Sequence, residues 1–259
     1  MPSRVRSQRV EAIVLRHADW GEADRLLWLF TRQMGKVQAV AKGVRKPRSR
    51  KAGHLEPFTR VELLLASGRD LLIITQAEAK ETYLALREDL VRMGYASYVI
   101  ELLDRFTYGE GENIALFRLL AETLSRLNGE SQPAFAVRYY EVRLLDHVGF
   151  RPQLLKCVNC GEEIRAEDQY FSFEKGGVIC PKCGRKEPGV RSVSMPALRI
   201  LRHFQRSAYA EAQRARLSSS VDQELENLMG QYLTYLLERG LNSPAFLRHV
   251  RNIAERGND

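Results

Sequence analysis

The first 80 residues contain short runs in which apolar and polar positions alternate, a pattern typical of strands with one buried face. Met34-Gly35 marks a turn after the second run, and Ser67-Gly68-Arg69 joins the last two runs. This part of the chain therefore predicts five β-strands, over Val10–Arg16, Arg25–Thr31, Lys36–Ala41, Phe58–Leu65 and Asp70–Thr75.

Five strands in such a short segment are typical of a small Greek-key barrel of the oligonucleotide-binding (OB) type. The long interruption between the third and fourth strands, residues 42–57, is expected to form a loop. Another small barrel or a half-sandwich with the same number of strands would give the same pattern, and periodicity alone does not separate these folds.

Near Lys80 the period of the pattern changes, and apolar residues then recur at helical spacing. A well-marked amphipathic helix follows Asn113 and ends near Asn128-Gly129, and further helices are expected over 84–106, 133–149, 195–214, 221–239 and 244–254. We therefore expect an α+β multi-domain protein in which an N-terminal OB-type β-barrel (1–79) is followed by a mainly α-helical domain (80–156 and 184–259). A module rich in cysteine (157–183) is inserted into the helical domain.

All four cysteines lie in that module, as the pairs Cys157/Cys160 and Cys180/Cys183 with 19 residues between the pairs. Two Cys-x-x-Cys pairs at this separation predict a tetrahedral thiolate site for zinc. Four protein ligands leave no position for water or substrate, so the predicted role of the metal is structural. A disulfide framework is less favoured, because the chain shows no apolar signal segment or membrane-spanning run and a reducing cytosol is the expected environment.

The turns around the cysteines also carry expectations. Gly161 and Gly184 directly follow the two pairs and are expected to supply a positive φ. Residues 169–173 and 177–179 are expected to form a hairpin between the pairs. His147, ten residues before Cys157, is an alternative ligand, although the all-cysteine set is simpler.

The net charge of +8 is confined to the first fifth of the chain. Residues 1–53 hold 13 Lys/Arg and 4 Asp/Glu, whereas residues 54–259 hold 27 and 28. A basic loop over Lys42–Lys51 has no acidic residue. A charge run can be a solvated face or can contact an anionic membrane, but a polyphosphate offsets it best, because each neutralised phosphate releases a counterion. The candidate nucleic-acid-binding cations are Lys42, Arg45, Lys46, Arg48, Arg50 and Lys51.

A barrel with such a loop would bind single strands through phosphate contacts and base stacking. Trp20 falls in a polar segment that predicts a loop, so it is the candidate stacking residue. Trp28, Phe30 and Phe58 fall in predicted strands and are expected to belong to the core.

Several short sequence motifs, spread over most of the chain, together resemble those of one known family. In the first part they are Ala12–Leu15, Gly21–Leu26, Phe30-Thr31, Gly35, Ala41–Lys46 and Leu55–Phe58; beyond it they are Phe117, Tyr139–Glu141, Leu144-Leu145, Gly149–Pro152 and the cysteine pairs. This set resembles the RecO family of bacterial DNA repair proteins. The last 60 residues resemble the family only in helical character, and Trp20 stands where the family more often has tyrosine.

The resemblance implies an OB domain, a helical domain and a role in recombinational repair. Members of the family bind single- and double-stranded DNA, anneal complementary strands, and act with RecR to load RecA on strands coated by single-strand-binding protein. The expected partners are therefore DNA, RecR and single-strand-binding protein, and the expected location is cytoplasmic and associated with the nucleoid. Some members lack the cysteines, which agrees with zinc as a local scaffold.

The sequence does not predict catalysis. The acidic group Asp19, Glu22 and Asp24 is better explained as a polar turn between two strands than as a nuclease metal site. The five histidines are scattered, and the chain has neither a His-Glu-x-x-His motif nor a P-loop. An RNA-binding protein linked to translation or RNA folding, with an OB barrel and a zinc ribbon, is the alternative to a DNA repair mediator, and a pure interaction scaffold is the third possibility.

Overall fold

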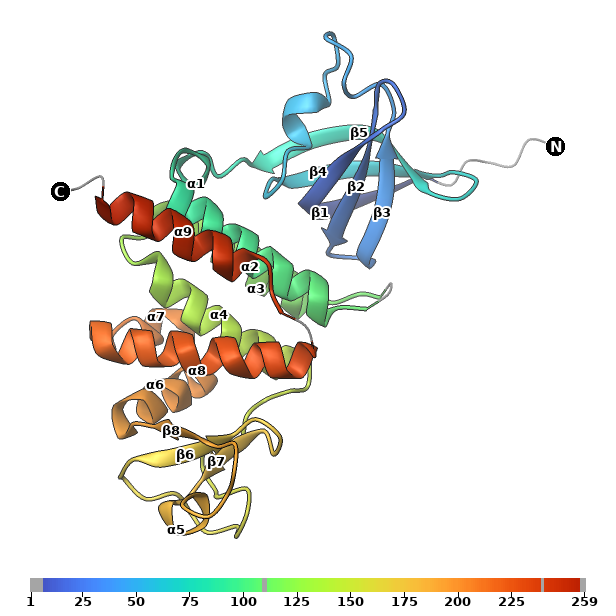
Figure 1. The fold of residues 1–259 in the computed structure, drawn as a ribbon. Helices are drawn as coiled ribbons and strands as arrows, with labels where there is room; N and C mark the ends of the chain where they lie inside the picture. Colours follow the sequence, from blue (N-terminus) through green and yellow to red (C-terminus); the bar gives the residue numbers. More distant parts are fainter. Residues whose placement is uncertain (1–6, 109–110, 239, 257–259) are drawn as a thin grey trace. The chain divides into compact units, whose positions relative to one another are not determined.

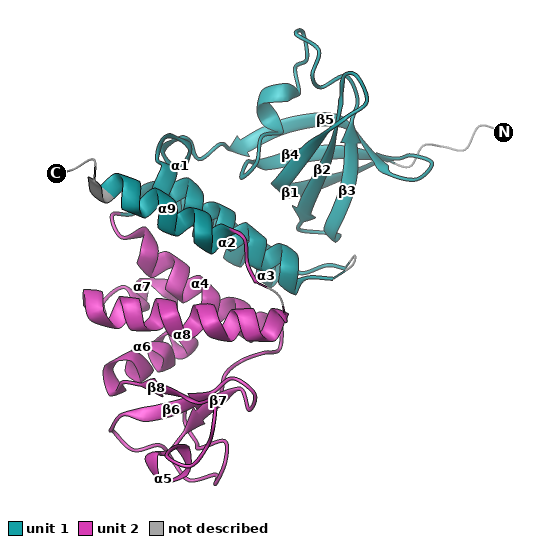
Figure 2. Ribbon diagram, viewed as in Figure 1, with its two compact units in different colours: residues 1–130, 243–259 teal, residues 131–242 magenta. Residues whose placement is uncertain are grey.

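The computed structural model describes residues 7–108, 111–238 and 240–256. Contacts divide the chain into two compact units (Figure 2): unit 1 comprises residues 1–130 and 243–259, and unit 2 comprises residues 131–242. Within the described residues, no helix combines the length and the apolar character needed to cross a membrane.

Unit 1 begins with a closed five-stranded barrel, in which the strands follow the order β1-β2-β3-β5-β4 (Figure 1). Its strands are β1 (Ser7–Trp20), β2 (Asp24–Thr31), β3 (Gly35–Ala41), β4 (Arg60–Ser67) and β5 (Leu72–Glu81). The long strand β1 pairs with β4 through its first half and with β2 through its second half, which closes the barrel. The predicted OB-type barrel is confirmed, and the interruption between β3 and β4 carries only the short 3₁₀-helix η1 (Ala52–His54).

The core of the barrel consists of alternate residues of each strand, such as Leu27 and Leu29 of β2 and Val37 and Ala39 of β3. Strand β1 and strand β5 both continue beyond their predicted ends, to Trp20 and to Glu81. Backbone hydrogen bonds to the neighbouring strands hold these polar extensions in the sheet. Backbone pairing does not require alternating apolar side chains, so the sequence pattern did not predict the extensions.

The helices that the structure describes in unit 1 are α1 (Leu84–Glu88), α2 (Leu90–Phe106), α3 (Ile114–Gly129) and α9 (Ser243–Arg256). The helical segment expected over 84–106 is divided into α1 and α2, because Asp89 adopts an extended backbone and its carboxylate caps the N-terminus of α2. Asn113 caps α3 as its position predicts. Helix α9 packs on α2, where Gly94 admits the side chain of Leu247.

The described part of unit 2 contains the cysteine module and the helices on either side of it. In chain order its elements are α4 (Pro133–His147), β6 (Gln169–Ser172), β7 (Gly177–Ile179), α5 (Pro181–Gly184), β8 (Arg191–Val193), α6 (Met195–Arg206), α7 (Tyr209–Ala212) and α8 (Ser219–Leu237). The hairpin of β6 and β7 is confirmed, and β8 adds a third strand that the sequence did not indicate.

The single helix expected over 195–214 is wrong. Helix α6 ends at Arg206, and Ser207 is extended, with its carbonyl accepting a hydrogen bond from the Tyr139 hydroxyl at 3.1 Å. Tyr209 then packs edge-to-face on Phe135 and Tyr139. The break thus places an aromatic ring in the core of the unit, which a straight helix would not do.

Candidate nucleic-acid interface and metal centre

The basic loop projects from one end of the barrel between β3 and η1 (Figure 1). Two apolar side chains, Val44 within the loop and Leu55 just beyond it, are fully buried in the barrel core. Lys42, Lys46, Arg48 and Arg50 are exposed. The loop is therefore fixed to the barrel by its apolar residues, and its cations extend into solvent.

The turn between β1 and β2 holds the loop by its backbone. The Asp24 carboxylate accepts a hydrogen bond from the N–H of Gly43 at 2.7 Å, and the carbonyl of Ala23 accepts one from the N–H of Arg45 at 2.9 Å. Gly43 has a φ of 65°, a left-handed conformation that glycine adopts without a steric cost. These bonds give the loop a defined starting direction.

The six candidate cations fall into two groups. Arg45 forms an ion pair with Asp19 at 3.2 Å, and the Lys51 ammonium donates to the carbonyls of Lys42 and Ile74, both at 3.1 Å. Burial lowers the pKa of Lys51. Among the described residues, the other four side chains form no ion pair: Lys42, Lys46, Arg48 and Arg50. These four are available to phosphates, whereas Arg45 and Lys51 already stabilise the loop.

The acidic group lies at the β1–β2 hairpin, as expected of a polar turn. Asp19 faces Arg45 and, at 3.9 Å, Arg25, while Asp24 caps the backbone of Gly43. The group therefore supports the basic loop, and it does not converge on a metal position in the described part of the chain.

Two of the four aromatic residues, Trp20 and Trp28, are placed differently from the predictions. Trp20 is half exposed, but it is the last residue of β1 and not part of a loop. Phe30 and Phe58 are buried as expected. The prediction that Trp28 belongs to the core is wrong: Leu27 and Leu29 point inward, so Trp28 lies on the outer face, where the guanidinium carbon of Arg16 is 3.5 Å from its ring centroid.

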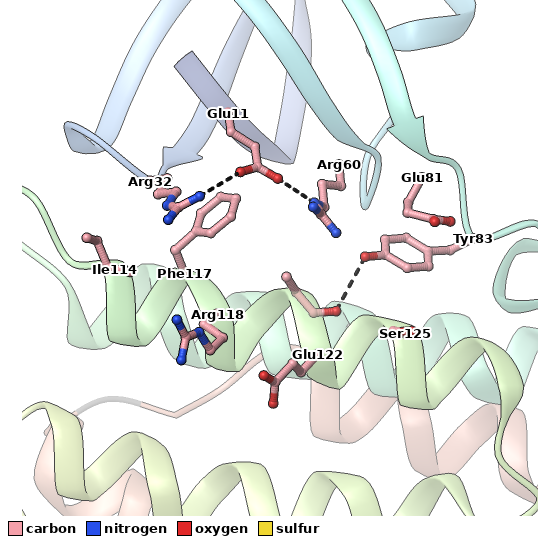
Figure 3. A pocket seen from close by; sticks show the side chains of 11 residues that line it. Glu11, Arg32, Arg60, Glu81, Tyr83, Ile114, Phe117, Arg118, Glu122 and Ser125 are labelled. Carbon is pink, nitrogen blue, oxygen red and sulfur yellow. Dashed lines mark hydrogen bonds and ion pairs between the residues drawn. The ribbon is translucent and has the colours of Figure 1, made fainter.

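A pocket of about 360 Å³ lies in unit 1 between the barrel and α3 (Figure 3). Glu11 accepts from Arg60 at 2.6 Å and pairs with Arg32 at 3.6 Å, while the Tyr83 hydroxyl donates to the carbonyl of Ala121 at 3.3 Å. Burial is the main reason why the pKa of Tyr83 rises to about 12. The charges of the barrel side of this pocket thus compensate one another, and its residues connect the barrel to α3.

The four cysteines converge in unit 2, with all four sulfur atoms within 4.8 Å of one another. Cys157 and Cys160 belong to a turn before β6, whereas Cys180 directly precedes α5 and Cys183 lies within it. The Sγ atoms of Cys160 and Cys180 are 3.8 Å apart, and all four thiols are free of disulfide bonds. Four sulfurs that each lie about 2.3 Å from a central zinc ion would also be about 3.8 Å apart, so the donor set fits a tetrahedral metal site.

Backbone donors favour the thiolate form of Cys157. Burial alone would raise the pKa of the Cys157 thiol, but backbone N–H groups of three residues point at its sulfur, that of Cys180 at 3.3 Å, and lower the pKa to about 6. Metal ligation requires the thiolate, so this arrangement favours a metal ligand.

The two glycines after the cysteine pairs have different roles. Gly161 has the expected positive φ of 78°. Gly184 does not: it is the last residue of α5, and the Tyr170 ring occupies the space that a β-carbon would need. Glycine is required there by close packing, which a local motif cannot reveal.

Comparison with known proteins agrees with this architecture. The N-terminal model of recombination protein O matches residues 5–83, and its C-terminal model matches residues 87–245. Relatives described as "DNA repair protein RecO" include one from Roseiflexus sp. (strain RS-1), 40% identical over 96% of this chain and 88% of the relative. Another, from Pelotomaculum thermopropionicum, is 40% identical over 92% of this chain and 93% of the relative. A third, from Dehalococcoides mccartyi (strain CBDB1), is 36% identical over 94% and 96%.

The barrel, the helical region and these matches define a protein of DNA repair and recombination. The chain belongs to the RecO family.

Proposed function

We propose that this protein is a DNA-binding recombination mediator, which binds single- and double-stranded DNA, anneals complementary strands and helps RecR to load RecA on strands coated by single-strand-binding protein. Membership in the RecO family supports a role in DNA repair and recombination. The observation that carries the DNA-binding step is the basic loop, whose four uncompensated cations extend from a barrel of the OB type.

Annealing by this loop requires no covalent step. Lys42, Lys46, Arg48 and Arg50 neutralise phosphates of two strands at once, which lowers the repulsion between the strands and releases counterions. Loading of a recombinase needs a second surface that binds RecR and single-strand-binding protein, for which the helical region is the candidate. The protein acts in the cytoplasm, at the nucleoid.

The metal of the cysteine module is zinc in this proposal, held by Cys157, Cys160, Cys180 and Cys183. Zinc supplies charge compensation and a rigid crosslink between the two turns, and four thiolates leave no open position for chemistry. Its role is therefore to stabilise unit 2.

The experiment that tests the proposal measures annealing of complementary oligonucleotides coated with single-strand-binding protein. The variant replaces Lys42, Lys46, Arg48 and Arg50 by glutamine. A matched control replaces four exposed cations elsewhere, so that the net charge changes equally: Arg165, Arg199, Arg214 and Arg216.

We expect the wild-type protein and the control to accelerate annealing and the loop variant to lose most of the acceleration while remaining folded. Failure of the wild-type protein to anneal strands at low salt would contradict the proposed function. A matched RNA that competes better than DNA would instead favour an RNA-binding function.

A further inference from the structure

On the outer face of the barrel, one side chain from each of three neighbouring strands forms a row: Arg16 of β1, Trp28 of β2 and Gln38 of β3. We propose that this row is a stacking site for a nucleobase of a single strand. The inference rests on the proposed function, and it adds a site that the basic loop does not supply.

The sequence builds the row by means of a β-bulge. Val14 of β1 pairs with Leu29, and the next pair is Arg16 with Trp28, so Leu15 is an extra residue in β1. In a regular ladder without the bulge, Leu15 would pair with Trp28 and Arg16 with Leu27, whose side chain points into the core. The bulge therefore moves Arg16 to the outer face, directly across from Trp28.

The geometry of the row suits a planar ligand. The guanidinium carbon of Arg16 lies 3.5 Å from the centroid of the Trp28 ring, and Arg16 itself is exposed. A guanidinium stacked on an indole presents its second face to solvent, and such faces stack on bases. Gln38, also exposed, offers an amide donor and an acceptor that can pair with a base edge.

A hollow next to Trp28 provides room for a base. Its volume is about 370 Å³, within the range of small-ligand sites, and it is lined by residues of β2 and β3, by the loop before β5, which includes the acidic Asp70, and by the first residue of β5. The hollow lies beside the first half of β3. This half has no paired strand on that side, because β3 pairs with β5 only at Ala39 and Val40. In OB folds, the face of strands 2 and 3 with the adjacent loops is the usual ligand surface.

The row also lies within reach of the basic loop. Gln38 and Lys42 are four residues apart along β3 and its end, a distance of about 13 Å at 3.3 Å per residue. OB folds cover about 4 to 16 nucleotides. One strand can therefore stack on the row while its phosphates reach the loop.

The test uses the protein's only two tryptophans, Trp20 and Trp28. Trp20→Phe leaves Trp28 as the single reporter, and Trp28→Phe leaves Trp20. We expect oligo(dT) to quench the fluorescence of Trp20→Phe strongly and that of Trp28→Phe little. We expect Trp28→Leu to weaken binding of oligo(dT) by about 5- to 150-fold, the range for loss of one stacked base, and binding of duplex by less than twofold.

Trp28→Phe keeps an aromatic ring and serves as the rescue variant, with an affinity for oligo(dT) within about threefold of wild type. Circular dichroism and thermal melting confirm that Trp28→Leu is folded. Unchanged affinity of folded Trp28→Leu, or quenching of Trp20 in place of Trp28, would overturn the stacking site while leaving the proposed function intact. A wild-type protein that binds neither strand form would instead refute the proposed function.

Discussion

At the scale of single residues, Lys51 and Arg48 show that cations of the same loop serve different purposes. The Lys51 ammonium donates to two backbone carbonyls, one in the loop and one on β5, and burial lowers its pKa. Arg48 is exposed. The first side chain stabilises the loop, whereas the second is available to a phosphate.

We therefore expect Lys51→Met to lower the free energy of unfolding by about 1–2 kcal/mol, because two carbonyls lose their donor. Arg48→Met should change stability by less than about 0.5 kcal/mol. It should reduce the slope of log affinity for single strands against log salt by about 0.7. Urea unfolding and salt titrations measure both effects, and equal stability of the two variants would show that the Lys51 ammonium does not stabilise the loop.

At the scale of elements, the cysteine module depends on its turns more than on its short strands. Strands β6, β7 and β8 have four, three and three residues, too few to be stable without further support. The four thiols and the packing of Phe171 and Phe173 on Tyr232 of α8 supply that support. Metal and aromatic contacts are therefore expected to act together.

Removal of the metal by a chelator should lower the melting temperature and the far-ultraviolet circular dichroism of the protein, because the thiolates lose the ion that compensates their charge. Tryptophan fluorescence should not change, since Trp20 and Trp28 both belong to the barrel. DNA binding should stay within about twofold of the untreated protein. Resupply of zinc is the control, and loss of DNA binding on chelation would show that the module contributes to the interface.

At the scale of the whole molecule, the uneven distribution of charge determines which part of the protein attracts a polyanion. Residues 1–53 carry a surplus of nine cations, from 13 basic and 4 acidic residues, while the remainder is close to neutral. Long-range attraction is therefore directed to the barrel, and salt screens it.

The variant that lacks Lys42, Lys46, Arg48 and Arg50 should reduce the salt slope for single strands by about 3, at about 0.7 per phosphate contact. Between 50 and 200 mM salt, wild-type affinity should then fall about 50-fold more than that of the variant. Fluorescence anisotropy of a labelled oligonucleotide measures this. The control that lacks Arg165, Arg199, Arg214 and Arg216 has the same net charge, and an equal loss of slope in it would show that binding depends on total charge and not on the loop.

The sequence by itself determined what local patterns encode. Alternation fixed the five strands of the barrel, because every second side chain must be buried. The Cys-x-x-Cys spacing identified the four residues that converge, and charge density identified the basic loop. Whether those residues bind zinc and DNA stays a prediction for the experiments above.

Only the tertiary structure decided what depends on residues distant in the chain. The bulge at Leu15 places Arg16 across from Trp28, and the ring of Tyr170 leaves room only for glycine at position 184. The ammonium of Lys51 donates a hydrogen bond to the carbonyl of Ile74 in β5. In each case the role of a residue depends on the residue that packs against it. The pairing of strands and turns in the fold determines which residue that is. The sequence therefore determined which elements form, and the fold decided which of their side chains remain free to bind.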